Sequence, residues 1–415
     1  MPDSARVEEH GALSVGGLPL TELAARFGTP VFVYDEDHLR ARCREAVAAW
    51  GDGVAYASKA FLCRAMAALA HEEGMWLDVA TGGEMHVALS AGVPAGRLVL
   101  HGNNKSDAEL AAAVEAGVGR IVVDSFDEIA RLEGLGGHGA VPKVLVRVTP
   151  GIEAHTHEYI MTGQIDSKFG FGIASGDADR AVEILAKSAS VELVGVHAHI
   201  GSQVFVVESF EREVEVLARF FTPLGLGELC VGGGLGVAYV AGERAPTITE
   251  WAQGVKGACA RYGVDESVRV TAEPGRSVVA AAGVTLYTVG TVKRIPGVRD
   301  YVAVDGGMSD NPRPVLYGSG YEAFLPRQAT AERPWRVTVV GKHCESGDFV
   351  VRDAQVPEDL AVGDVLATPV TGAYGHSMAS NYNKVPRPPV VFVSGGEARV
   401  VVRRETYDDL TALDV

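Results

Sequence analysis

The chain has 415 residues, of which 47% are hydrophobic, 22% charged and 7% aromatic. With 37 basic and 53 acidic side chains its formal net charge is −16, which opposes binding to nucleic acid and to anionic membranes. The apolar content is ample for a sizeable core and excludes a generally disordered chain, and the length suits two or three domains.

The sequence also predicts a cytoplasmic protein without a membrane-spanning segment. Its longest weakly polar stretch, 277–292, is interrupted by polar residues and falls short of the roughly 20 apolar residues that span a bilayer. The opening MPDSARVEEHG is acidic and lacks the apolar core of a signal peptide. The cysteines are odd in number, scattered and without a CxxC pair: Cys43, Cys63, Cys230, Cys259 and Cys344. This pattern favours a reducing compartment and predicts neither a disulfide framework nor a metal site.

Eight short β-branched runs, each followed by a segment of helical period, occupy the first two thirds of the chain. They span 54–58, 76–80, 97–101, 120–124, 143–148, 193–200, 228–234 and 269–275. The first five begin 22, 21, 23 and 23 residues apart, which leaves room for a strand, a helix and two short loops. Such units form a parallel sheet, and eight of them favour a closed (β/α)8 barrel of the TIM type over an open doubly wound sheet.

After about residue 282 the alternation ends, and short runs of two-residue period follow with glycine and proline between them. This pattern predicts a second domain built as an antiparallel β-sandwich or small barrel. The N-terminal segment before 31–35 is too short to be a domain, and we expect it to join the second one. The polar, glycine-containing segment 151–176 is expected to be a functional loop of the barrel.

Polar side chains follow the predicted strands at their carboxyl ends, where an α/β barrel carries its active site. They are Lys59, Asp78, His101, Arg147, His197, His199, Glu273 and Arg276. Lys59 follows an apolar strand, and a lysine in apolar surroundings can form a Schiff base with an aldehyde, although its ammonium can also simply reach solvent. Lys105 and Lys168 are rivals on loops of the same face, each with a simpler interpretation as a solvated lysine.

The run GGGLG at 232–236 exposes backbone N–H groups as phosphate-binding loops do, although glycine runs also make tight turns. Glu273 could pair with the protonated ring nitrogen of a cofactor or simply with Arg276, and His199 could be a satisfied core histidine. A Schiff-base lysine, a phosphate loop and a carboxylate for a ring nitrogen together describe a site for pyridoxal phosphate.

The chain resembles the fold-III pyridoxal-phosphate-dependent decarboxylases, and within them the branch that acts on diaminopimelate. The matching segments, in the order of that family, are VAYASKA, LDVATGGE, HGNNKS, HEYIMTGQIDSKFGFG, HAHIGSQ, GGGLG, EPGRS, DGGMSDNPRPVLYG, CESGD and GAYGHSMASNYN. The resemblance implies a barrel over residues 35–282 and a β-sandwich made of residues 1–34 together with 283–415.

The resemblance also implies roles on pyridoxal 5'-phosphate. Lys59 would bind the cofactor aldehyde as a Schiff base, His199 would stack on the ring, and Glu273 would keep the ring nitrogen protonated, with Asp78 and Arg147 in support. The groups implied for the phosphate are Ser202, the backbone of Gly236, the Gly275–Arg276 turn and the hydroxyl of Tyr374.

For the substrate, the resemblance implies an amino acid whose far end meets Arg276, Arg313, Tyr317 and Tyr374. It also implies a homodimer with composite sites, in which Cys344 and Glu345 come from the neighbouring subunit, and in which Cys344 or Lys59 protonates the product carbon.

One departure within the wider fold bears on the substrate. Relatives that form diamines carry an acid after the tyrosine of this segment, whereas Gly318 follows Tyr317 here. Two arginines at the far end suit a distal carboxylate. The expected reaction is therefore decarboxylation of meso-2,6-diaminopimelate to L-lysine and CO2, the last step of lysine biosynthesis. The alternatives are decarboxylation of ornithine, arginine, a D-amino acid or carboxynorspermidine, and a non-catalytic carrier or regulator that binds pyridoxal phosphate.

Overall fold

The computed structural model describes residues 1–135, 141–152 and 166–415, which divide into two compact units. The barrel unit comprises Arg42–Val237 and Arg244–Ser277. The sheet unit comprises Met1–Ala41, Ala238–Glu243 and Val278–Val415. Among the described helices, none combines the length and the apolar character that crossing a bilayer requires.

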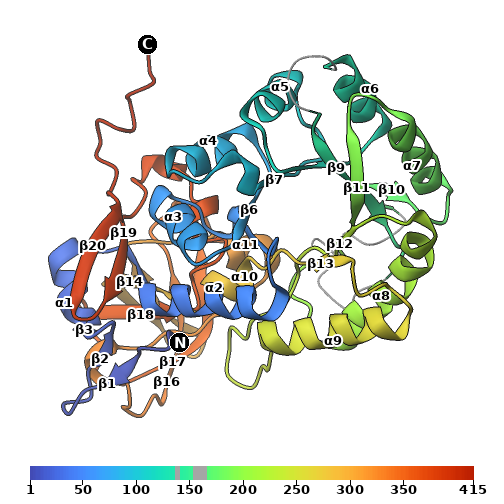
Figure 1. Cartoon of the computed structure of the whole chain (residues 1–415). Helices are drawn as coiled ribbons and strands as arrows, with labels where there is room; N and C mark the ends of the chain where they lie inside the picture. The colour runs from blue at the N-terminus through green and yellow to red at the C-terminus, as the bar shows by residue number, and fades with distance from the viewer. Residues whose placement is uncertain (136–140, 153–165) are drawn as a thin grey trace. The chain divides into compact units, whose positions relative to one another are not determined.

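Eight parallel strands form the wall of the barrel unit (Figure 1). In chain order they are β5 (Ala55–Ala57), β6 (Trp76–Val79), β7 (Leu98–Leu100), β8 (Arg120–Val123), β9 (Lys143–Thr149), β11 (Glu192–His197), β12 (Glu228–Cys230) and β13 (Arg269–Thr271). Each falls within or within one residue of a predicted run. The N–H groups of Ala55 and Ala57 donate to the carbonyls of Ala272 and Pro274 at 3.0 and 3.1 Å, so the first strand meets the last. The predicted closed barrel is confirmed.

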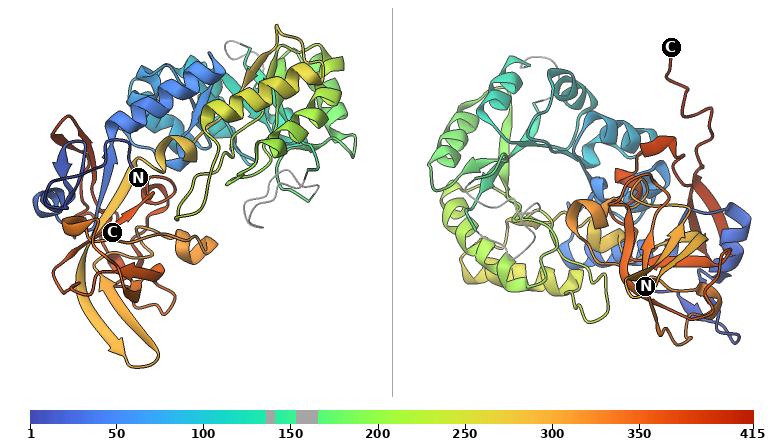
Figure 2. Two further views of the ribbon diagram at one scale, coloured as in Figure 1. Left: turned by 90° about the horizontal axis from the view of Figure 1, so that it is seen from below. Right: turned by 180° about the vertical axis from the view of Figure 1, so that it is seen from behind.

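Helices join successive strands and surround the wall as an outer ring (Figures 1 and 2). They are α3 (Arg64–Glu72), α4 (Gly82–Ser90), α5 (Asp107–Ala116), α6 (Phe126–Gly134), α7 (Asp177–Lys187), α8 (Val207–Phe221) and α9 (Ile248–Arg261), with α2 (Glu36–Trp50) before β5 and α10 (Arg276–Val279) after β13. Side chains cap several starts: Thr81 accepts from the Glu84 amide, and Ser106 forms a capping box with Glu109. These caps bond amides that the first helical turn leaves without partners, and so fix where each helix begins.

Apolar side chains from the strands pack together in one layer of the barrel core. This layer consists of Ala55, Trp76, Val99, Val122, Leu145 and Cys230. Because side chains alternate between the two faces of a strand, the residue two positions further along points the same way. Four of those positions hold buried polar groups: Asp78, His101, Asp124 and Arg147. The alternation of side chains along each strand therefore points both sets into the barrel: the apolar layer, and the polar groups nearer its carboxyl end.

Half of the predicted functional loop at 151–176, namely residues 153–165, lies outside the described residues. Its described end includes β10 (Phe171–Gly172), a short strand that pairs in parallel with the end of β9. Lys168 lies here with its Nζ 5.0 Å from the centre of the Phe169 ring.

The sheet unit is built on a mixed sheet in the order β17–β16–β15–β14–β4–β19–β20, with β18 paired to β14. Its strands are β4 (Val31–Asp35), β14 (Gly283–Ile295), β15 (Arg299–Val304), β16 (Trp335–Val340), β17 (Phe349–Val356), β18 (Val365–Pro369), β19 (Val390–Ser394) and β20 (Glu397–Val402). A small sheet of β1 (Arg6–Val7), β2 (Leu13–Val15) and β3 (Leu18–Pro19) precedes α1 (Leu20–Phe27), and α11 (Arg313–Tyr317) is a short helix. The core includes Leu23, Val33, Leu286 and Val391, all fully buried.

The predicted second domain of strands is confirmed, with two differences in detail. Most neighbouring strands are antiparallel, including the long hairpin of β14 and β15 drawn in orange in Figure 2, but β15 and β16 are parallel, and so are β4 and β19. A tight hairpin turn forces two strands to run antiparallel. Strands joined by a long connection can pair in parallel instead. The strand β18, with the sequence VLATP, lacks a clear alternating pattern and was not expected. The N-terminal segment before 31–35 lies in the sheet unit, and the run 31–35 itself forms the central strand β4.

Candidate active site

Lys59 lies in a short helical turn, Ser58–Ala60, directly after β5. Its side chain is 47% exposed, and its Nζ lies 3.7 Å from Oδ2 of Asp78, whose side chain is 2% exposed. Within the described chain neither oxygen of Asp78 has a hydrogen-bond partner. The arrangement is an accessible primary amine held near a buried carboxylate, as a Schiff-base lysine requires.

Glu273 is bound by two histidines rather than by Arg276. The Nε2 atoms of His101 and His197 lie 2.8 and 3.0 Å from its two carboxylate oxygens, and all three side chains are buried. Burial opposes the charge of Glu273, but interaction with the two histidines holds the pKa of this carboxyl well below its ordinary value. Glu273 therefore carries a negative charge at the carboxyl end of the barrel.

His199 presents a neutral ring beside the glycine run. Its Nδ1 accepts a hydrogen bond from the Gly233 amide at 3.1 Å. Burial, together with the nearby cations of Lys59 and Arg147, holds the pKa of His199 well below its ordinary value. A neutral, flat imidazole suits stacking on an aromatic ring.

The glycine run brings the ends of three strands together. A Cβ at Gly232, Gly233 or Gly234 would lie 2.4, 2.3 or 2.3 Å from a backbone carbonyl oxygen of the segments after β11 and β13. No other residue type fits at such distances. At this run the backbone therefore packs directly against the backbones of the two other segments, which a simple turn would not require. Further along, the Gly236 amide donates to the carbonyl of Val204 at 2.9 Å.

The segment after β13 adds polar groups to the same end of the barrel. Arg276 is buried at the start of α10 and donates through Nη2 to Ser202 Oγ at 2.9 Å. Gly275 packs against Ala57, since a Cβ there would lie 2.9 Å from the Ala57 Cβ. The hydroxyl of Ser277 is buried without a hydrogen-bond partner in the described part of the chain. Ser277 was not singled out from the sequence, although it lies within the EPGRS segment.

A buried network supports Arg147. Its Nη1 lies 3.3 Å from Oδ2 of Asp124, whose Oδ1 accepts from the Gly170 amide at 2.6 Å. The Asp124 amide in turn donates to Glu128 at 3.0 Å, and Glu128 accepts from Lys105 Nζ at 2.7 Å.

The interpretation of Lys105 as a solvated lysine is therefore wrong. Its side chain is 2% exposed, and its ammonium also donates to two backbone carbonyls, of Gly102 and Val122. Burial lowers the pKa of Lys105 and raises that of Glu128, while their mutual attraction opposes both shifts. Asp124 directly ends the fourth predicted strand, so the strand-end rule that found Asp78 could also have found it.

In the sheet unit, three of the predicted substrate residues lie together. Arg313 begins α11, is 5% exposed, and has its guanidinium carbon 5.6 Å from the ring centre of Tyr317 and 5.9 Å from that of Tyr374. Its Nε donates to the hydroxyl of Tyr321 at 2.9 Å, and its Nη2 donates to Ser319 Oγ at 3.0 Å. Neither Tyr321 nor Ser319 was identified from the sequence.

Cys344 and Glu345 lie on another loop of the sheet unit, held by the segment that follows Ser380. The Cys344 amide donates to Oδ1 of Asn383 at 3.0 Å, and the hydroxyl of Tyr382 donates to Glu345 at 3.3 Å. Cys344 is an exposed free thiol, whereas the other four cysteines are buried.

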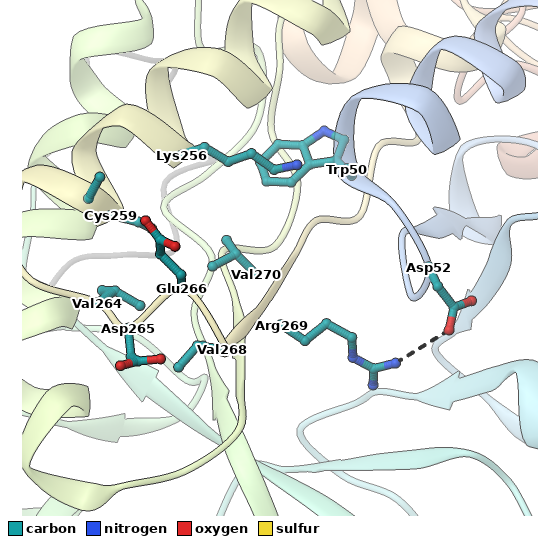
Figure 3. Close-up of a pocket in the computed structure, with 11 residues that line it drawn as sticks. Trp50, Asp52, Lys256, Cys259, Val264, Asp265, Glu266, Val268, Arg269 and Val270 are labelled. Atoms are coloured by element: carbon teal, nitrogen blue, oxygen red, sulfur yellow. Dashed lines mark ion pairs between the residues drawn. The ribbon is translucent and has the colours of Figure 1, made fainter.

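A cavity of about 500 Å3 opens at the opposite end of the barrel (Figure 3). Its lining includes Val268, Arg269 and Val270 at the amino end of β13, and Lys256 and Cys259 of α9. None of the predicted site residues lines it. In α/β barrels this end contributes to stability, and the chemistry takes place at the other end.

The closed barrel, its accessible lysine and its charged glutamate fit a pyridoxal-dependent decarboxylase of the barrel type, and a family comparison shows that class. Residues 36–280 match the family model described as the pyridoxal-binding domain of pyridoxal-dependent decarboxylases.

Comparison with individual proteins narrows this class. A diaminopimelate decarboxylase from Mycobacterium bovis is 48% identical over 100% of this chain and 97% of its own length, and one from Bacillus subtilis is 47% identical over 99% and 97%. The crystal structure of a diaminopimelate decarboxylase from M. jannaschii in complex with L-lysine is similar with a TM-score of 0.92 at 33% identity, covering 100% of this chain and 99% of that one. The chain belongs to the diaminopimelate decarboxylase family.

Proposed function

We propose that this chain decarboxylates meso-2,6-diaminopimelate to L-lysine and CO2, the last step of lysine biosynthesis. The observation that carries the choice of substrate is the buried cation of Arg313. Its guanidinium is buried, and among the described residues no carboxylate forms an ion pair with it. A buried charge normally has a counter-ion, and a substrate with a second carboxylate would supply one.

The residues of the barrel unit fit pyridoxal phosphate, as three observations indicate. Glu273 carries a charge that a protonated ring nitrogen would pair with, the glycines at 232–234 let the backbones of three strand ends meet closely, and the buried Ser277 hydroxyl has no hydrogen-bond partner in the described chain. When bound, the cofactor supplies an electron-poor ring that accepts the electron pair left by the departing CO2.

Each side chain of the barrel site would then have a separate role. Lys59 would bind the cofactor through Nζ, and Asp78, 3.7 Å away, would stabilise the protonated amine. Glu273 would hold the proton on the ring nitrogen, and the neutral His199 would pack on the ring face. Arg147 would add positive charge near Lys59 and His199, kept in place by Asp124.

The phosphate ligands proposed are Ser202, Gly236, Gly275, Arg276 and Tyr374, to which we add Ser277. A phosphate oxygen that binds the Gly236 amide would share or replace the hydrogen bond that this amide donates to the Val204 carbonyl.

For the substrate, Arg276 in the barrel unit is proposed to bind a carboxylate. In the sheet unit, Arg313 would bind the distal carboxylate, Tyr317 would contact the same end of the substrate, and Glu345 would accept the distal ammonium. Cys344 Sγ would deliver a proton to the carbon that loses CO2, with Lys59 as the other candidate.

The decisive assay is CO2 release by the purified protein with pyridoxal phosphate, comparing meso-diaminopimelate, L-lysine, L-ornithine and L-arginine. We expect release from meso-diaminopimelate alone, with L-lysine formed in equal amount, and no release by Lys59→Ala. Release from L-ornithine instead would keep the chemistry and refute the argument from Arg313. Failure with every substrate would favour a non-catalytic carrier or regulator.

We also propose a homodimer in which Cys344 and Glu345 act in the site of the neighbouring subunit. Complementation tests this directly. If Cys344 is the proton donor, Lys59→Ala and Cys344→Ala should each be inactive. Subunit exchange between them should then restore about a quarter of the wild-type activity, because half of the dimers are mixed and each has one intact site. Exchange that is verified by mass but restores no activity would mean that each site is built from a single chain.

A cytoplasmic location is proposed on the state of the cysteines. Four are buried free thiols and Cys344 is an exposed one, the state that a reducing compartment maintains. Cell fractionation with an antibody to the chain would test it.

A further inference from the structure

The surroundings of Arg313 are unusual because its buried charge is met by neutral oxygens and aromatic faces. Besides its two hydroxyl partners, three rings lie within cation–π distance of the guanidinium carbon: Tyr239 at 5.0 Å, Tyr317 at 5.6 Å and Tyr374 at 5.9 Å. Burial opposes the charge, but Tyr239 and Tyr321 raise the pKa of Arg313 above its ordinary value. The guanidinium therefore stays positively charged, and its hydrogen-bond partners among the described residues are neutral.

The two hydroxyl groups determine which edge of the guanidinium stays open. A guanidinium has five N–H groups in a planar fork. Tyr321 takes the Nε hydrogen at 2.9 Å, and Ser319 takes one Nη2 hydrogen at 3.0 Å. Among the described residues, no hydrogen-bond partner meets the two Nη1 hydrogens or the second Nη2 hydrogen. One hydrogen of Nη1 and one of Nη2 form the end of the fork, which can grip a carboxylate in bidentate fashion.

Local structure explains why Ser319 reaches Arg313. The helix α11 ends at Gly318, which has the left-handed backbone angles φ 61° and ψ 22° and donates its amide to the Arg313 carbonyl. This turn brings Ser319 back over the first residue of the helix. Gly318 allows this turn because glycine adopts left-handed backbone angles without strain, and it adds no carboxylate next to Tyr317.

Tyr321 is itself held in position from another segment of the sheet unit. Its ring meets that of Tyr239 edge-on, with centres 5.3 Å apart and an interplanar angle of 80°. The segment that carries Tyr239 is tied to the residue after Tyr321, because the Ala241 amide donates to Glu322 at 2.7 Å. Both tyrosines are buried, so the Tyr321 hydroxyl has a fixed position.

We infer that Tyr321 and Ser319 are positioning residues that orient the guanidinium of Arg313 and thereby set the preference for a ligand with a second carboxylate. The inference rests on the proposed function and extends it, because neither residue needs to touch the substrate. Without the two hydroxyls the guanidinium keeps its charge but rotates, and it loses the bidentate grip.

The test uses Tyr321→Phe and Ser319→Ala in the full-length holoenzyme, with Tyr407→Phe as the matched control, since Tyr407 is 79% exposed. Two binding probes separate orientation from general damage. L-Lysine retains the distal carboxylate and cadaverine lacks it. For each variant we expect the KM for meso-diaminopimelate and the inhibition constant of L-lysine to rise about tenfold, as for loss of one oriented, charge-assisted contact. The kcat and the inhibition constant of cadaverine should stay within about twofold of wild type.

The outcomes separate this inference from the proposed function. Wild-type protein that does not turn over meso-diaminopimelate would overturn the proposed function. Active wild type with unchanged KM and L-lysine inhibition in both variants would overturn only the inference. Equal weakening of L-lysine and cadaverine, together with a lower kcat, would show a general structural role and would also overturn it.

Discussion

Glu213 should destabilise the barrel unit at neutral pH, and its replacement by glutamine should remove that effect. The residue lies on α8 and is fully buried, and both of its carboxylate oxygens are buried without a hydrogen-bond partner in the described chain. Burial raises the pKa of Glu213 well above its ordinary value of 4.5. At a pH between 4.5 and the raised pKa of the folded chain, Glu213 is protonated in the folded chain and ionised in the unfolded chain.

The sign and size of the effect follow from this difference. The contribution of Glu213 to stability is full below pH 4.5 and is lost as the pH rises toward its value in the folded chain. While the pH lies between 4.5 and the raised pKa of the folded chain, the loss is about 1.4 kcal/mol per pH unit. For a unit of this size, that corresponds to a Tm change of roughly 3 to 6 °C per pH unit. Glutamine has the same shape and does not titrate, so the Glu213→Gln variant should lack this part of the pH dependence.

The assay is differential scanning calorimetry from pH 5 to pH 8 on wild type, Glu213→Gln and the control Glu208→Gln, an exposed residue of the same helix. The advantage of Glu213→Gln over wild type should grow with pH, while the control should run parallel to wild type. Parallel curves for wild type and Glu213→Gln would refute the reasoning, because they would mean that Glu213 ionises in the folded chain at no cost.

Three further predictions concern other buried groups. Lys105→Met leaves Glu128 buried without its counter-ion and should cost about 3 to 5 kcal/mol in urea unfolding, whereas Lys105→Met/Glu128→Leu should cost less; equal losses would contradict this. Burial raises the pKa of Asp310 to about 7, so its stabilising contribution is full below pH 3.8 and is lost as the pH rises through 7. Asp310→Asn should flatten the fall in Tm between pH 5 and pH 8, and an unchanged slope would count against it. Gly234→Ala would place a Cβ 2.3 Å from the Gly201 carbonyl oxygen and should weaken pyridoxal phosphate binding at least about tenfold in a fluorescence titration; wild-type affinity would exclude this role of the glycine run.

The barrel could be predicted because its strands follow a simple rule. Each is a short, apolar run, and the first five recur at nearly constant spacing, so their number and order were readable from the sequence alone. The same regularity placed Lys59, Asp78 and Arg147 at one end of the barrel. The rule needs no knowledge of distant contacts, because it depends only on the alternation of side chains along each strand.

The remaining features depend on contacts between distant segments. Lys105 and Glu128 are 23 positions apart, and nothing local distinguishes a loop lysine that is buried by such a partner from one that is solvated. The parallel pairing of β15 with β16 is likewise invisible, since both strands read as ordinary alternating runs. Tyr321 was missed because its role is to accept a hydrogen bond from another side chain, and tyrosine in a glycine-rich loop has no characteristic pattern.

Closure of the barrel also sets the order in which two groups of the proposed site come together during synthesis. Lys59 follows the first strand and Glu273 the last, and the two are joined through the bond from the Ala57 amide to the Pro274 carbonyl. A chain still emerging from the ribosome therefore displays its amine more than two hundred residues before the carboxylate exists. Docking of the eighth strand is thus the folding event that brings Glu273 to the end of the barrel where Lys59 lies.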